Sequence, residues 1–185
     1  MKLHTIICST RPGRIGPSIG KWFNDAANAH GAFKSELVDL ADFNLPIYDE
    51  PRHPRLGQYE HEHTKKWAAS VASADAYAFV IPEYNYFAPP SFVNAIDYLT
   101  NEWSFKAAAM VSYGGVSGGM RAAQSAKGLL TTVNMMPIPQ GVALPMVMQS
   151  IKDGVYTSNA LVDDSVKQTL DVLAKWAGAL KTVRG

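Results

Sequence analysis

Cysteine is nearly absent from this sequence, and so is any excess of charge of one sign. The single cysteine, Cys8, excludes an internal disulfide and is typical of a reducing compartment. The formal net charge of +1 gives no electrostatic reason to bind nucleic acid or an anionic membrane. No apolar run approaches the ~20 residues of a membrane span, and the apolar N-terminal run is too short for a signal peptide. We therefore expect a cytoplasmic protein with no nucleic-acid and no membrane partner.

The composition is typical of a folded globular protein. Apolar residues make up 47% of the chain and charged residues 18%, which distinguishes it from a disordered chain. Its 185 residues are enough for a sizeable core. We expect one domain over residues 1–185, since no linker, repeat or low-complexity tract interrupts the sequence.

Apolar strand-like runs alternate with helical patterns along the whole chain. This alternation predicts an α/β protein with a parallel sheet and helices on both faces. Three prolines in the last strand segment indicate an edge position, and the proline-rich segment 41–57 reads as a long surface loop. The predicted strands cover 2–8, 33–40, 76–81, 107–112 and part of 136–147, and the predicted helices cover 17–30, 59–73, 91–101, 120–133 and 163–183.

The loop after the first strand, Ser9 to Gly16, has the residues of an anion site. A helix begins directly after it, and free backbone N–H groups at a helix start attract phosphate. Ser9 supplies a hydroxyl, while Arg11 and Arg14 supply positive charge. The loop matches neither the dinucleotide fingerprint nor the nucleotide P-loop, so a monophosphate is the better interpretation. The alternative is a solvated turn with surface arginines.

The central strand is followed by Pro82-Glu-Tyr-Asn85 and an aromatic loop. Open α/β sheets bind their ligands beyond the carboxyl ends of their strands, which is where these residues fall. An ordinary turn is the alternative for this tetrapeptide.

The loop after the fourth strand, Ser112 to Gly119, contains four glycines in eight residues. Glycines let the backbone approach a flat ligand closely, and Tyr113 could stack on that ligand. Gly115 to Gly119 also matches G-x-S-x-G, the nucleophile elbow of serine hydrolases. That fold needs a histidine after the serine, and every histidine here precedes Ser117, so we disfavour a hydrolase.

Three smaller patterns favour structural roles. His61-Glu62-His63 lacks the H-E-x-x-H spacing of a zinc site, so we expect no metal there. Cys8 is the last residue of a predicted buried strand, has no evident base beside it and reads as a small core residue. Asp97 and Glu102 could be paired acids, but positions on a helix face are the favoured interpretation.

Taken together, the three loops resemble the NADPH-dependent FMN reductase family, whose flavodoxin-like members include azo-dye, quinone and chromate reductases. The resemblance spans essentially the whole chain. It implies a flavodoxin-like three-layer sandwich with a five-stranded parallel sheet in the order 2-1-3-4-5, FMN as cofactor, NAD(P)H as electron donor, and a homodimer or homotetramer. The matching stretches are Ser9–Gly16, Pro82–Asn85 with Pro89 and Asn94–Asp97, and Ser112–Ala122.

The resemblance also implies roles for individual residues. The first loop would hold the FMN phosphate, the central loop would line the isoalloxazine ring, and the third loop would pack against its pyrimidine side. Tyr84, Tyr86 and Phe87 are our candidates for shaping the acceptor pocket. The implied cofactor-binding residues are Ser9, Arg11, Arg14, Ile15, Gly16, Pro82, Glu83, Tyr84, Asn85, Ser112, Tyr113, Gly114 and Gly115.

The resulting hypothesis is a reductase that passes hydride through the flavin N5 atom to a small acceptor (a flavin, a quinone, an azo dye or a metal oxyanion) with ping-pong kinetics. No catalytic acid or nucleophile is needed, since the flavin carries the chemistry. One alternative is a flavodoxin-like electron carrier for a protein partner, although such carriers are typically acidic. A second alternative keeps the fold but binds another phosphorylated ligand.

Overall fold

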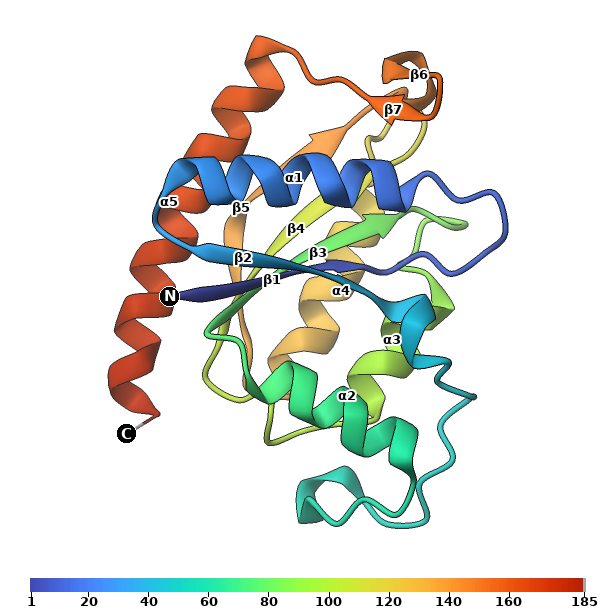
Figure 1. Cartoon of the computed structure of the whole chain (residues 1–185), viewed down its shortest axis with the longest axis vertical. Helices are drawn as coiled ribbons and strands as arrows, with labels where there is room; N and C mark the ends of the chain where they lie inside the picture. The colour runs from blue at the N-terminus through green and yellow to red at the C-terminus, as the bar shows by residue number, and fades with distance from the viewer. Residues whose placement is uncertain (185) are drawn as a thin grey trace.

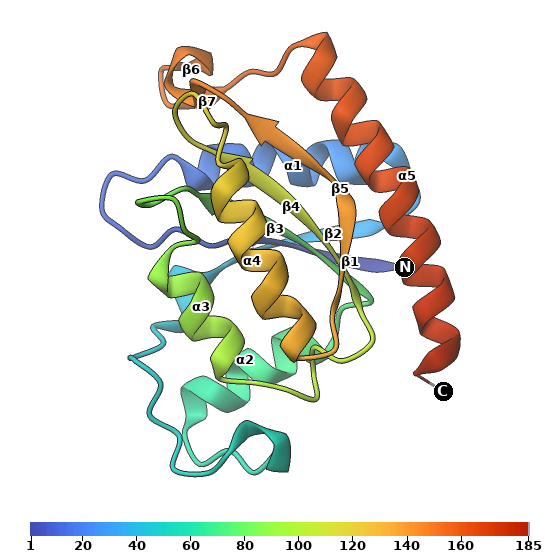
Figure 2. The ribbon, with the colours of Figure 1, turned by 180° about the vertical axis from the view of Figure 1, so that it is seen from behind.

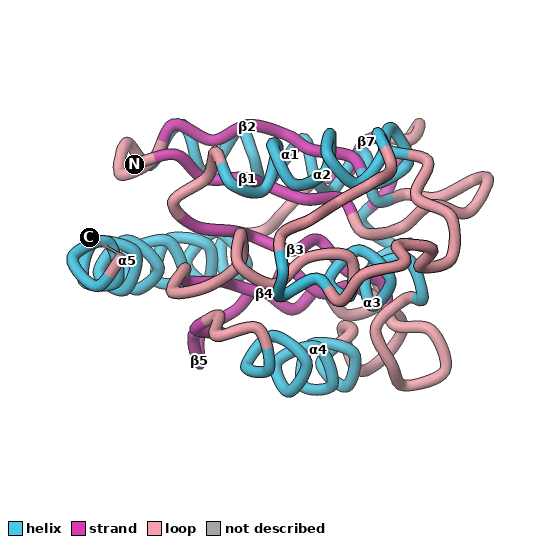
Figure 3. The backbone as a smooth tube through the Cα atoms, turned by 90° about the horizontal axis from the view of Figure 1, so that it is seen from below, coloured by secondary structure: helices cyan, strands magenta, loops and turns pink. Residues whose placement is uncertain are grey.

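The computed structural model describes residues 1–184 and contains a five-stranded parallel sheet in the order β2-β1-β3-β4-β5 (Figure 1). Figure 3 shows the strands following one another from β2 to β5. This confirms the predicted order, and β5 is an edge strand, as its prolines predict. The strands are β1 (Lys2–Ile7), β2 (Lys34–Asp39), β3 (Ala76–Pro82), β4 (Ala107–Tyr113) and β5 (Met136–Leu144).

Helices cover both faces of the sheet (Figures 1 and 2). Residues of α1 and α5 share one core, and residues of α2, α3 and α4 share the core on the opposite face of the sheet. No helix within residues 1–184 is long and apolar enough to cross a membrane. One face carries α1 (Gly16–His30) and α5 (Ala160–Val183), and the other carries α2 (Glu62–Ala72), α3 (Pro90–Asp97) and α4 (Met120–Thr132).

Alternation along β3 separates the two cores. Tyr77 and Phe79 enter the core beneath α2, α3 and α4, whereas Ala76 and Ala78 enter the core beneath α1 and α5. All seven residues of β3 are buried, as expected for a strand with helices on both sides. The core beneath α2, α3 and α4 is the aromatic one, with Trp67, Tyr77, Phe79, Phe92 and Trp103 fully or almost fully buried.

Several element boundaries differ from those predicted. Helix α5 begins at Ala160, three residues early, because the Asn159 side chain accepts a hydrogen bond from Val162 N at 3.1 Å and caps the helix. Helix α3 ends at Asp97 rather than at residue 101. The long loop contains two short 3₁₀ helices, η1 (Leu40–Phe43) and η2 (Pro54–Leu56).

A small antiparallel hairpin that the periodicity did not predict follows β5. It consists of η3 (Val147–Ser150), β6 (Ile151–Lys152) and β7 (Val155–Tyr156). The backbone N–H of Tyr156 donates to Ser18 Oγ at 2.7 Å, which ties the hairpin to the first turns of α1.

A buried histidine lies in β1. His4 is 2% exposed, and its Nδ1 atom has no hydrogen-bond partner among residues 1–184. Burial, with a smaller contribution from the charge of Lys2, lowers the pKa of His4 from 6.5 to about 4, although Glu36 acts in the opposite direction. The folded protein therefore holds a neutral imidazole at neutral pH.

We expect His4 to make the protein less stable in mild acid. Between pH 6.5 and pH 4 the unfolded chain binds a proton that the folded chain excludes, so the free energy of unfolding should fall as the pH is lowered. The contribution should reach about 2–3 kcal/mol, since one pKa unit corresponds to about 1.4 kcal/mol. Urea unfolding from pH 4 to pH 7.5 measures it. His4→Met should unfold with a flatter pH dependence, and identical slopes for the two proteins would contradict this assignment.

Candidate functional site

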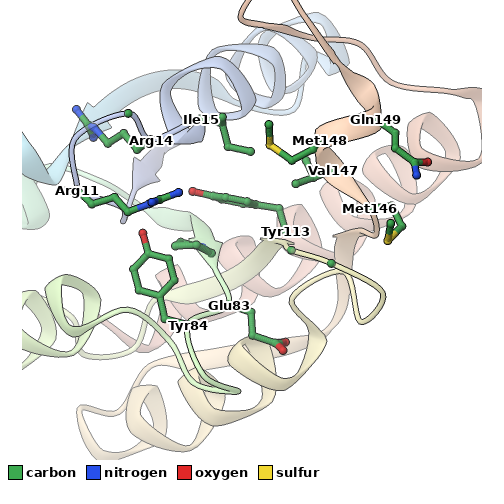
Figure 4. A pocket seen from close by; sticks show the side chains of 14 residues that line it. Arg11, Arg14, Ile15, Glu83, Tyr84, Tyr113, Met146, Val147, Met148 and Gln149 are labelled. Carbon is green, nitrogen blue, oxygen red and sulfur yellow. The ribbon is translucent and has the colours of Figure 1, made fainter.

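Three loops meet at the carboxyl edge of the sheet because the backbone ladder continues past the strand ends. Cys8 N donates to Val80 O at 3.0 Å, and Glu83 N donates to Tyr113 O at 3.1 Å. The loops after β1, β3 and β4 therefore lie side by side, and a cavity of about 340 Å³ opens between them (Figure 4). This volume is typical of small-molecule sites.

Most of the residues expected at the site line this cavity. They are Arg11, Arg14, Ile15, Pro82, Glu83, Tyr84, Tyr113, Gly114 and Gly115. Six others do not form its walls, namely Ser9, Gly16, Asn85, Tyr86, Phe87 and Ser112. Gly13 and the segment 146–149 complete the lining. Sequence reasoning missed that segment, although it follows the strand beside β4 and so reaches the same edge.

The start of α1 is open to an anion. Ile15 occupies the N-cap position without a side-chain cap, and the first turn holds no acidic residue. The Ser9 hydroxyl nearby is 1% exposed and has no hydrogen-bond partner among residues 1–184. A buried hydroxyl without a partner is unfavourable, so a ligand atom at this position would satisfy it.

Gly16 allows the first and third loops to approach each other closely. A Cβ atom at Gly16 would lie 3.0 Å from the Tyr113 hydroxyl oxygen and would collide with Ser9 Oγ. Tyr113 is buried, and burial raises the pKa of this phenol well above its ordinary value, so it is neutral. Tyr113 lines the cavity, and its hydroxyl reaches toward the first loop (Figure 4). Stacking of its ring on a ligand stays a prediction.

The two arginines of the first loop have different surroundings. Arg14 donates to both carboxylate oxygens of Asp39 at 2.6 and 2.7 Å and to Ser9 O at 2.6 Å, and hydrogen bonding to Asp39 raises its pKa. Its guanidinium points away from the cavity (Figure 4), so its charge is already paired. Arg11 makes no ion pair within residues 1–184, and its guanidinium points toward the Tyr84 and Tyr113 hydroxyls (Figure 4).

The central loop forms a tight hairpin. Tyr84 and Phe87 exchange both backbone hydrogen bonds at 3.0 Å. The two residues between them have positive φ, 50° for Asn85 and 73° for Tyr86. Tyr84 lines the cavity, whereas the Tyr86 and Phe87 side chains are 62% and 66% exposed and lie outside its walls.

The Glu83 side chain is bound by residues of the third loop and α4. Its carboxylate accepts from Ser117 Oγ at 2.9 Å and from Arg121 Nε at 2.7 Å. Burial alone would raise the pKa of Glu83, but the hydrogen bonds from Arg121 and Ser117 prevail and lower it. The carboxylate is therefore ionised, and it points away from Arg11 and Tyr113 (Figure 4).

The glycines of the third loop fold it back over the end of β4. Gly119 has φ of 79°, and a Cβ atom there would lie 2.6 Å from Tyr113 N, so only glycine fits. Ser112 Oγ donates to Gly118 O at 2.9 Å. Met146 N donates to Gly115 O at 2.8 Å, which fixes the segment 146–149 as the remaining wall.

The competing motifs do not assemble other sites. The Ser117 hydroxyl donates to Glu83 rather than to an imidazole, so it lacks the base of a hydrolase. His63 Nε2 lies 3.0 Å from Asp49 Oδ1, and residues 1–184 contain no group of three or more His, Cys, Asp or Glu side chains that could hold a metal ion. The Cys8 thiol is buried and donates to Ile6 O.

Comparisons with known proteins agree with this arrangement. The family model described as NADPH-dependent FMN reductase matches residues 1–149. The NAD(P)H-dependent FMN reductase ntnL of Nectria sp is 38% identical over 165 residues, which are 83% of this chain and 82% of that protein. An NAD(P)H-dependent FMN reductase of Schizosaccharomyces pombe is 37% identical over 100% of this chain and 87% of its own.

A solved structure shares the fold. FerB, a flavoenzyme NAD(P)H:(acceptor) oxidoreductase from Paracoccus denitrificans, aligns with a TM-score of 0.76 at 21% identity over 96% of this chain and 97% of its own. This likeness confirms the flavodoxin-like architecture. The family match and the two reductases confirm the resemblance that the loop motifs predict. The chain belongs to the NADPH-dependent FMN reductase family of oxidoreductases.

Proposed function

We propose that this protein binds FMN in the cavity at the carboxyl edge of the sheet and uses NAD(P)H to reduce a small acceptor. The acceptor class covers flavins, quinones, azo dyes and metal oxyanions. The observation that carries the proposal is a geometry suited to binding an anion at one end of the cavity: Ile15 at the uncapped start of α1 and Arg11, which has no ion pair within residues 1–184, both line it. The Ser9 hydroxyl, which has no hydrogen-bond partner among the same residues, is buried behind that wall, next to Gly16. Family membership supports FMN and NAD(P)H as the cofactor and the donor.

The residues of the first loop fit a phosphate group. The backbone N–H groups at the start of α1 would donate to its oxygens, and Ser9 would donate the hydroxyl that is otherwise unsatisfied. Arg11 would supply positive charge, since Arg14 is paired with Asp39. In this proposal Arg14 holds the loop in shape through its bond to the Ser9 carbonyl rather than contacting the phosphate.

The remaining walls fit a flat aromatic ring. Pro82 and Tyr84 form one wall, and Gly114 and Gly115 form another with exposed backbone. Val147 and its neighbours add apolar surface from the segment 146–149. Asn85 and Ser112 would act indirectly, Asn85 by shaping the hairpin turn and Ser112 by holding Gly118 O.

Bound FMN would supply hydride acceptance and donation at its N5 atom, so the chain itself needs no acid–base pair or nucleophile. The protein's contribution is to bind the phosphate, orient the ring and position each reactant against it in turn, which gives ping-pong kinetics. Among the three aromatic candidates for the acceptor pocket, only Tyr84 lines the cavity. Its side chain is therefore the best placed to shape the space that the acceptor enters.

We expect purified protein that is given FMN and then freed of the excess to keep a visible flavin band that anaerobic NADPH bleaches. Tight binding of the phosphate should retain FMN on the protein, and reduction of FMN by NADPH should remove its visible absorption band. Absorption spectra recorded before and after NADPH measure both. Steady NADPH oxidation with a quinone and no protein partner should follow.

Other outcomes would favour the alternatives. A retained band that NADPH leaves unchanged would indicate an electron carrier that serves a protein partner. No retained band and no FMN affinity in a titration would contradict the proposal and favour another phosphorylated ligand.

Arg11→Ala should weaken FMN binding by about 10- to 100-fold, since a hydrogen bond to a charged group contributes about 1.5–3 kcal/mol. Fluorescence titration of FMN measures the affinity. Arg55→Ala removes an arginine from η2, away from the cavity, and serves as the matched control with unchanged affinity. Equal affinities for Arg11→Ala and the unmodified protein would remove Arg11 from the phosphate site.

Gly16→Ala should destabilise the protein by about 1–3 kcal/mol and reduce FMN affinity, because the new Cβ atom collides with Ser9 and crowds Tyr113. Gly128→Ala is the matched control, since it lies in α4 with nothing within 4 Å of the added Cβ atom. That change should stabilise by about 0.5–1 kcal/mol. Urea unfolding measures the change in the free energy of unfolding for each variant. A change of the same sign in both would show that the close approach at Gly16 does not affect stability.

A further inference from the structure

Four side chains at the edge of the cavity, of which only Glu83 lines it, form a cluster that the proposed chemistry does not use. These side chains form a chain of contacts that we call the hairpin clamp; they belong to Glu83, Ser117, Arg121 and Tyr86. Glu83 accepts from Ser117 Oγ and from Arg121 Nε, and Arg121 Nη2 lies 3.1 Å from Ser117 Oγ. The Arg121 guanidinium carbon lies 3.8 Å from the centre of the Tyr86 ring.

The clamp holds a strained turn. Two-residue hairpin turns with positive φ at both central residues are usually built from Asn-Gly, because a side chain at the second position is unfavourable. Here Tyr86 occupies that position with φ of 73°. The guanidinium stacked on its ring supplies a cation–π contact that offsets part of this strain.

The carboxylate at the centre of the clamp is well suited to hold an arginine in place. The Glu83 side chain is 7% exposed, whereas the Arg121 side chain is 49% exposed. Arg121 also donates its backbone N–H to Glu83 at 3.2 Å. Because the guanidinium is planar, it can bind the carboxylate with its edge while its face lies on the Tyr86 ring, which a lysine ammonium cannot do.

The clamp links two walls of the cavity. Glu83 lies in the chain between Pro82 and Tyr84, which line one wall, and Ser117 follows Gly114 and Gly115, which line another. The contacts of Arg121 therefore join the hairpin 84–87 to the third loop.

We propose that Arg121 is a positioning residue that holds the hairpin 84–87 closed and thereby determines the size of acceptor that the cavity admits. This inference rests on the proposed reductase function. Arg121 itself does not line the cavity, so it acts through Tyr86 and through the backbone on either side of Glu83.

Hydrogen–deuterium exchange tests the clamp without flavin or donor. In Arg121→Gln, the Tyr84 and Phe87 amides, which bond across the hairpin, should exchange about fivefold faster or more, while the β3 and β4 amides keep their rates. Arg121→Lys keeps the charge but loses the planar contact with the Tyr86 ring, so the exchange rates of its hairpin amides should lie between those of the unmodified protein and of Arg121→Gln. Lys167→Gln is the matched control, since it removes an exposed cation paired within a helix on the opposite face of the sheet.

Kinetics with two quinones test the specificity role. The unmodified enzyme should prefer 1,4-benzoquinone over the larger menadione, and Arg121→Gln should reduce that preference in kcat/KM at least threefold. The change should come from KM for menadione, while kcat with benzoquinone and the affinity for FMN stay within twofold. A general loss of structure would instead lower every parameter together.

The outcomes separate this proposal from the one it rests on. Faster local exchange together with an altered quinone preference, partly restored in Arg121→Lys, supports it. Unchanged exchange overturns the clamp, and faster exchange with an unchanged preference overturns the specificity role. Local exchange that responds as expected in a protein that oxidises no NAD(P)H would instead overturn the proposed function and, with it, the specificity role.

Discussion

The parallel register of β1, β3 and β4 is the constraint on which the rest of the molecule depends. A slip of one residue would turn Tyr77 and Phe79 toward α1 and α5, where the alanines of β3 now pack. The aromatic core beneath α2, α3 and α4 therefore fixes the register. The same pairing continues into the loops, since Cys8 bonds to Val80 and Glu83 bonds to Tyr113. The position of the cavity is thus a consequence of how the hydrophobic core packs.

Three arginines near the cavity differ in how far their positive charge is already paired with a carboxylate. Arg14 is paired with Asp39 of β2, and both side chains are less than one-fifth exposed. Arg121 is paired with Glu83, a nearly buried carboxylate. Arg11 has no such partner within residues 1–184. Positive charge that can act on a ligand is therefore concentrated at the start of α1, where the helix dipole has the same sign.

The fold could be predicted from the sequence to a large extent, and the individual roles within the site to a smaller one. Strand runs such as 76–81 and the alternating helices predicted the parallel sheet, and the motif resemblance predicted its order. Periodicity could not show that Arg14 meets Asp39, because those residues are 25 positions apart and only the β1–β2 pairing brings them together. The wall at 146–149 was missed for a similar reason, since backbone bonds to Gly114 and Gly115 place it.

Unusual backbone conformations occur in three of the segments that supply walls of the cavity. Asn85 and Tyr86 have positive φ in the hairpin 84–87, Gly118 and Gly119 in the third loop, and Met146 at the start of the segment 146–149. For residues other than glycine such conformations are unfavourable by themselves and persist where surrounding contacts enforce them. Here the enforcing contacts are backbone hydrogen bonds, among them Tyr84 with Phe87 and Met146 with Gly115. A cavity shaped by backbone amides rather than by reactive side chains suits a cofactor that brings its own chemistry and needs only to be held in place.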